Sequence, residues 1–174
     1  MKNMRWISVL CLVTAIALSG CGYTRKTVLP RNIKTIYVET VKNKLQVEDI
    51  YAYQPGLEMD ITNAVIRRFH QDGTAKIAEQ KNADAILKTD LLQFEQEGLR
   101  YTQLEEVKEY RLFIVVKFKL VDAKTGDVIM EEPNFTGDNE YYTTSVTSIG
   151  EQKASTDAVE KLARNIVGRV VEDW

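Results

Sequence analysis

Residues 110–122 read YRLFIVVKFKLVD, and the alternation within this stretch decides the fold. Every second side chain is apolar or aromatic: Tyr110, Leu112, Ile114, Val116, Phe118 and Leu120. Successive side chains of a β-strand point to opposite faces of the sheet, so this pattern predicts a strand with one face on a hydrophobic core. The intervening residues, expected on the opposite face, are Glu109, Arg111, Phe113, Val115, Lys117 and Lys119.

The segment that follows predicts a hairpin. Residues 122–127 (DAKTGD) indicate a turn, in which Gly126 can adopt a positive φ. Residues 128–137 (VIMEEPNFTG) then begin a partner strand. Pro133 has no N–H to donate, so this strand is expected toward an edge of the sheet.

The segment that precedes residue 110 predicts another long strand. Residues 83–98 (ADAILKTDLLQFEQEG) alternate in two phases, and a bulge near Leu91 would reconcile them. Residues 99–106 (LRYTQLEE) are expected to form the loop between the two long strands.

Two amphipathic segments predict helices. The first begins after Pro55 and Gly56, ends at Gly73, and has apolar residues on one face. These residues are Leu57, Ile61, Ala64, Val65 and Phe69. The second begins at Ser148, which forms a capping box with Glu151. Its stripe comprises Ser155, Val159, Leu162, Ile166 and Val170.

Two shorter strands are expected at residues 33–41 and 74–80. The order is therefore strand, helix, three or four strands, helix. This order predicts an α+β two-layer sandwich, with two helices packed on one face of a four- to five-stranded mixed sheet. The first strand, the helix and the second strand should form a right-handed crossover.

The N-terminal 20 residues are typical of a signal peptide. Lys2 and Arg5 precede an apolar run that is too short to cross a bilayer. The run ends in LSGC (18–21), which resembles the lipobox of bacterial lipoproteins. The resemblance implies cleavage before Cys21 and acylation of that cysteine, so residues 21–32 are expected to be a lipidated tether and residues 33–174 a single domain. Gly22 after the cysteine favours the outer membrane, with the domain facing the periplasm.

Composition argues against several function classes. The formal charge is −2, and it becomes −4 when the leader with its two basic residues is removed. A mildly acidic domain is not suited to non-specific nucleic-acid binding. Cys11 leaves with the leader and Cys21 is lipidated, so the mature domain is expected to have no disulfide.

No enzyme, cofactor or metal site is expected from the residues. His70 is the only histidine, and its place in the last turn of the first helix suits the helix dipole. Without a second histidine or a free cysteine, the mature sequence has neither the residues for thiol catalysis nor those of the usual zinc sites. The adjacent carboxylates at 105–106 and 131–132 should point to opposite faces of a strand or into solvent, which makes them poor acid–base pairs.

Several segments together resemble the LptE family of lipopolysaccharide-assembly lipoproteins. They are CGY (21–23), LPRNIKTIYVETVKN (29–43), PGLEMDITNAVIRRF (55–69), ADAILKTDLLQF (83–94), VDAKTGDVI (121–129) and EQKASTDAVEKLARNIV (151–167). The resemblance covers nearly the whole mature chain in order. It implies a two-helix, four-stranded sandwich that sits inside an LptD-like β-barrel, binds lipopolysaccharide and helps to insert it in the outer leaflet.

Two other functional interpretations of the sequence remain. One is an accessory lipoprotein of the CsgG-like or penicillin-binding-protein-activator type, although the Gly- and Thr-rich loop common in those classes is missing here. The other is a structural lipoprotein whose sheet binds a different periplasmic partner.

Four residues are candidates for contacts with partner and ligand. Phe113 and Val115 should point away from the helices and form a partner surface, unless they form a small cluster under a loop. Arg100 and Lys124, at the two expected loop tips, are candidates for contacts with lipid A phosphates, the alternative being solvated loop charges.

Overall fold

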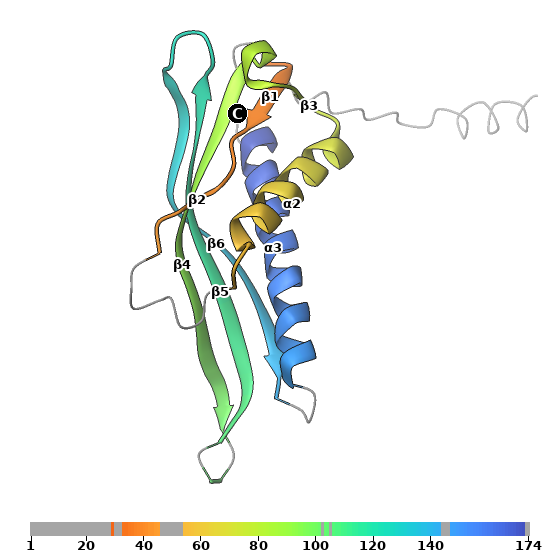
Figure 1. Cartoon of the computed structure of the whole chain (residues 1–174), viewed down its shortest axis with the longest axis vertical. Coiled ribbons are helices and arrows are strands. Elements are labelled where there is room, and N and C mark those ends of the chain that lie inside the picture. The colour runs from red at the N-terminus through yellow and green to blue at the C-terminus, as the bar shows by residue number, and fades with distance from the viewer. Residues whose placement is uncertain are drawn as a thin grey trace, which may run out of the picture.

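The sequence folds into a mixed sheet of six strands, with two helices covering one of its faces (Figure 1). The computed structural model describes residues 29, 33–45, 54–101, 103–104, 106–143 and 147–172. The α+β sandwich is therefore confirmed, and the sheet contains one strand more than expected, because residues 42–43 form a short strand that the sequence pattern does not predict. The signal peptide, Cys21 and most of the expected tether lie outside the described residues.

The strand order is β3-β1-β4-β5-β6, with β2 beside β4. The strands are β1 (Thr35–Val38), β2 (Lys42–Asn43), β3 (Lys76–Ile77), β4 (Ala85–Tyr101), β5 (Val107–Asp122) and β6 (Val128–Tyr142). β1 pairs in parallel with β3 and β4, whereas β4, β5 and β6 form an antiparallel meander. β6 ends the sheet, as Pro133 predicts.

The predicted bulge in β4 is confirmed. Leu91 pairs with Val116 and Gln93 pairs with Val115, so Leu92 is an extra residue without a partner in the register. Odd-numbered side chains of β4 face the core up to Leu91, and the inserted residue turns even-numbered side chains toward the core beyond it. Phe94 is fully buried as a result.

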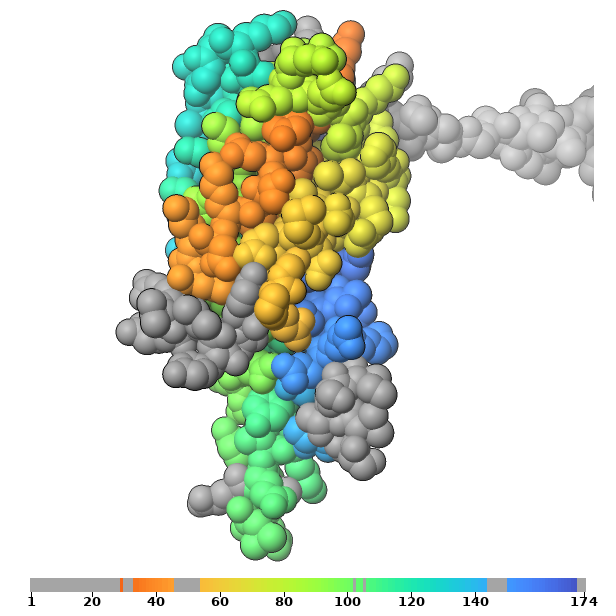
Figure 2. Space-filling view, viewed as in Figure 1, coloured from red at the N-terminus to blue at the C-terminus, as the bar shows by residue number. Residues whose placement is uncertain are grey.

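β4 and β6 are longer than the sequence suggests. β4 continues to Tyr101 and β6 to Tyr142, because both keep pairing with β5. The expected loop at residues 99–106 therefore begins as a strand. The lower ends of β4 and β5 protrude beyond the helices (Figure 2).

The helices are α2 (Leu57–Asp72) and α3 (Thr147–Glu172). α2 ends as predicted at Gly73, which has a φ of 76° and donates its N–H to the Phe69 carbonyl at 3.0 Å. α3 has 26 residues, so it is about 39 Å long and lies along much of the sheet. The side chain of Ser148, the expected cap, lies outside the described residues.

The core lies between the sheet and the two helices. α2 contacts β1 and β3, α3 contacts β5 and β6, and the helices contact each other. Leu112, Ile114, Val116, Phe118 and Leu120 are completely buried there, as their alternation predicts. The core also includes Leu29, which is only 2% exposed, so the expectation that residues before Ile33 form only a tether is wrong at this position.

Candidate functional site

The face of the sheet away from the helices has a basic concavity beside β2. We call it the lysine groove and define it by its lining residues, Lys42, Lys44, Lys88, Asp90, Lys117 and Lys119. Its volume is about 330 Å³. Five lysines and one aspartate therefore line one hollow in a protein that is acidic as a whole.

Strand pairing brings these residues together. Alternate side chains of β4 and β5 face the core, and the side chains between them lie on the outer face. The outer ones include Lys88, Asp90, Lys117 and Lys119. Lys88 lies directly opposite Lys119 in the register, and Asp90 lies opposite Lys117. β2 then places Lys42 beside Asp90.

Two of the five lysines are paired with carboxylates that do not line the groove. Lys42 Nζ lies 2.8 Å from a Glu39 carboxylate oxygen, and Lys117 Nζ lies 2.5 Å from one of Glu131. The hydrogen bonds and negative charges of these carboxylates raise the pKa of both lysines, and Lys117 in turn lowers the pKa of Glu131.

The other three lysines have a different environment. Lys44, Lys88 and Lys119 form no ion pair with any other residue in the described part of the chain. Like charges directly opposite one another on neighbouring strands destabilise a sheet, and Lys88 and Lys119 are such a pair.

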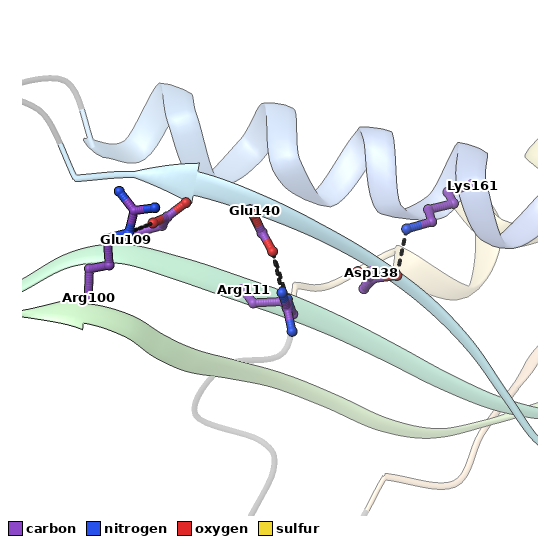
Figure 3. Close-up of polar contacts among 6 residues, drawn as sticks. All are labelled: Arg100, Glu109, Arg111, Asp138, Glu140 and Lys161. Carbon is purple, nitrogen blue, oxygen red and sulfur yellow. Dashed lines mark hydrogen bonds and ion pairs between the residues drawn. The ribbon is translucent and has the colours of Figure 1, made fainter.

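The lower half of the outer face is acidic by contrast. Glu95 and Glu97 project from β4, and Asp138 and Glu140 from β6. Glu140 forms an ion pair with Arg111, and Asp138 forms one with Lys161 of α3 at 2.7 Å (Figure 3). The positive charge of this face is therefore concentrated in the lysine groove.

Phe113 and Val115 lie on this lower half, on the opposite face from the core residues of β5. Both side chains are half-buried. One reason is that the Arg111 guanidinium lies over the Phe113 ring, 5.9 Å from its centroid.

Arg100 lies within β4 near the lower tip, and not in a loop. Its Nε is 2.9 Å from a carboxylate oxygen of Glu109, its partner in the register (Figure 3). The Glu109 side chain is only 5% exposed, whereas that of Arg100 is 70% exposed. Arg100 therefore neutralises a buried carboxylate. Three large apolar residues are exposed near this tip, namely Tyr101, Leu104 and Tyr142.

Lys124 lies in the β5–β6 turn at the opposite end of the sheet (Figure 1). The Asp122 carboxylate shapes this turn by accepting the backbone N–H groups of Lys124 and Thr125 at 2.8 and 3.1 Å. Lys124 lines a shallow hollow together with Lys81. The structure does not bring Arg100 and Lys124 together.

Residues considered for catalysis remain dispersed. His70 is exposed in the last turn of α2. Glu131 bonds Lys117 on the outer face, whereas Glu132 bonds Arg169 of α3 at 2.6 Å. Within the described residues, no three or more His, Cys, Asp and Glu side chains form a group that could hold a metal ion. None of the helices in that part of the chain is long and apolar enough to cross a bilayer.

The model of the LptE lipopolysaccharide-assembly family matches residues 33–171, which is most of the chain. The chain belongs to the LptE family. This membership places it among the lipopolysaccharide-assembly lipoproteins, a family that is not enzymatic. No curated protein matches the chain in sequence.

Solved structures share the fold of this LptE-family chain at low sequence identity. A protein from Xanthomonas campestris has a TM-score of 0.59 at 16% identity, over 79% of this chain and 84% of that one. An uncharacterized lipoprotein B from Nitrosomonas europaea has a TM-score of 0.53 at 15% identity, covering 86% and 91%. A minor lipoprotein from Acinetobacter baumannii has a TM-score of 0.52 at 15% identity, covering 80% and 94%.

The lysine groove is not predictable from local patterns in the sequence. Lys117 and Lys119 were assigned correctly to the outer face, and the KNK sequence at 42–44 is visible in the chain. Their convergence with Lys88 depends on the register of β4 against β5 and on the pairing of β2 with β4. Local patterns do not specify either of these pairings.

Proposed function

We propose that this chain is an outer-membrane lipoprotein, anchored through Cys21, that binds lipopolysaccharide and supports an LptD-like β-barrel in its assembly. The match to the LptE family over residues 33–171 is the observation that carries this proposal. The LSGC sequence at 18–21 supports the anchor, and Gly22 supports the outer membrane.

In this proposal the outer face of the sheet contacts the barrel. Phe113 and Val115 form the apolar centre of that contact, since they are half-buried, face away from the helices and lie among charged side chains. Interface centres commonly combine an aromatic anchor with a polar rim.

Two positions serve as proposed contacts for the lipopolysaccharide phosphates. Arg100 is 70% exposed at the lower tip, where Tyr101 and Leu104 can meet acyl chains. Its pairing with Glu109 leaves the other guanidinium nitrogens able to donate to a phosphate. Lys124 lies at the far end of the sheet, so it can only make a separate contact.

Affinity purification of the lipidated protein from its own envelope tests the proposal. We expect it to recover a large β-barrel. Recovery of a penicillin-binding protein or of a homo-oligomeric ring, and no barrel, would favour an accessory lipoprotein and contradict the proposal.

A variant at Phe113 makes the same test specific for the surface. Glu95 and Asp138 are its neighbours in the register, so Phe113→Lys gains two opposite charges and should stay folded. We expect at least a tenfold loss of barrel recovery, equivalent to about 1.4 kcal/mol. Val128→Lys is the control, since Val128 is exposed at the other end of β6. Equal recovery with both variants would exclude this surface.

A further inference from the structure

We infer that the lysine groove is a binding site for phosphate groups, separate from both tips of the sheet. Five lysines line one hollow of about 330 Å³. Four belong to β2, β4 and β5, and the fifth, Lys44, directly follows β2. At roughly 30 Å³ for each water, this volume equals that of about ten water molecules. A compact anion therefore fits inside it.

The charge balance of the groove favours a bound anion. Asp90 and the ion-pair partners Glu39 and Glu131 supply three carboxylates against five ammonium groups, which leaves an excess of two positive charges. Lys119 lies between Lys88 of β4 and Glu131 of β6 in the register, so Glu131 offsets only part of the repulsion between the two lysines. An anion between these two ammonium groups would relieve their repulsion.

The chemistry of the groove points to phosphate. A phosphate monoester combines up to two negative charges with several acceptor oxygens in a small volume. Each lysine presents three donors on a flexible stem, and lysines bind phosphates as point charges. For an acidic protein surface, two of the five lysines are already paired, Lys42 with Glu39 and Lys117 with Glu131.

The phosphate can belong to the headgroup of a lipid or to a soluble compound. If it is the headgroup of lipopolysaccharide, the inference rests on the proposed function and adds a third contact region to it. If it is soluble, the groove is a site independent of lipid transport.

Calorimetric titration of the purified lipidated protein in neutral detergent tests the inference. The probes are inorganic pyrophosphate, micelles of purified lipopolysaccharide, and polyglutamate as an acidic polypeptide. The groove variant is Lys88→Ala with Lys119→Ala. The control is Lys76→Ala with Lys108→Ala, which removes the same charge from two exposed lysines outside the groove.

We expect the groove variant to raise the Kd for pyrophosphate and for lipopolysaccharide at least tenfold, and the control to change neither by more than about twofold. We expect the groove variant to melt close to the wild type, because it loses both the repulsion between Lys88 and Lys119 and the attraction between Lys119 and Glu131. With both variants folded at the titration temperature, a loss of binding is not caused by unfolding.

Each outcome has a distinct meaning. Loss of both ligands supports a phosphate site that takes a lipid headgroup, and loss of pyrophosphate alone supports a site for soluble phosphates. Unchanged binding of both ligands overturns the inference. Groove-dependent binding of polyglutamate without binding of pyrophosphate overturns it in favour of an acidic protein segment. Barrel recovery by the wild type tests the proposed function separately.

Discussion

At the scale of single residues, Asp84 explains why an AD sequence precedes β4. One of its carboxylate oxygens accepts hydrogen bonds from the backbone N–H groups of Lys34 and Thr35, at 3.0 and 3.1 Å. The same oxygen accepts the Thr35 hydroxyl at 2.9 Å, and Thr35 Oγ1 in turn accepts the Asp84 N–H at 3.0 Å. This carboxylate therefore joins the start of β1 to the start of β4.

Asp84→Ala should destabilise the protein by about 1–3 kcal/mol at neutral pH, because it leaves the Lys34 and Thr35 donors without their acceptor. The backbone hydrogen bond from Lys34 is the main cause that lowers the pKa of Asp84 from its ordinary 3.8. A lowered pKa contributes stability that is present above the ordinary pKa and is lost as the pH falls through the folded-state value.

Urea unfolding of wild type and Asp84→Ala at a series of pH values measures this difference. We expect the difference in unfolding free energy to narrow below about pH 4. A constant difference down to about pH 2 would show that the carboxylate charge is not the cause.

The proposed lipopolysaccharide contact at Arg100 can also be tested with a single substitution. Arg100→Glu would place a second carboxylate beside the buried Glu109, and its effect on ligand binding would be mixed with loss of stability. Arg100→Gln keeps a donor for Glu109 and adds no second carboxylate, so it is the better variant, and its binding assay is accompanied by a melting curve because Glu109 loses its counter-charge.

At the scale of elements, the contact between β6 and α3 depends on one glycine. A Cβ added at Gly137 would lie 2.6 Å from Leu162 Cβ and 2.7 Å from the Ala158 carbonyl oxygen. Ala158 and Leu162 are both completely buried, so α3 approaches the strand as closely as its backbone permits.

Gly137→Ala should therefore destabilise the protein by about 1–3 kcal/mol through overpacking. Gly168→Ala in α3 is the matched control, because an added Cβ there has no atom within 4 Å. The control should be neutral or stabilising by up to about 1 kcal/mol, since alanine favours helices. Thermal unfolding compares the two, and a neutral Gly137→Ala would mean that α3 moves away from β6 at little cost.

At the scale of the whole molecule, chain length limits how far the folded core can lie from the expected lipid anchor. Leu29 packs in the core, and the eight Cα–Cα steps from Cys21 to Leu29 span at most about 29 Å. An anchor at Cys21 would keep the fold within that distance of the membrane surface.

Two substitutions should separate anchoring from folding. Cys21→Ala is expected to release a folded protein into the soluble fraction, because Cys21 precedes every core residue of the described part. Leu29→Ala should leave the protein in the membrane but destabilise it by about 2–5 kcal/mol, as for other buried leucines. Fractionation, melting curves and mass spectrometry of the mature amino terminus measure the three properties. An unmodified Cys21 in the wild type would contradict the anchor.

The sequence by itself determined the elements with strong local patterns. The core face of β5 follows from uninterrupted alternation, the end of α2 from Gly73, and the bulge in β4 from a change of parity after Leu91. Pro133 likewise predicted the edge position of β6. Each of these features depends either on the period of apolar side chains or on the backbone freedom of one residue. A short segment of sequence is enough to reveal both properties.

Only the tertiary structure decided which charges meet. The length of β4 beyond Gly98 depends on pairing with β5, and that pairing turned Arg100 from an expected loop residue into the partner of a buried Glu109. The lysine groove depends in the same way on three strands aligned in one register. Electrostatic sites of this kind arise from distances between segments far apart in the chain, which only the folded register sets.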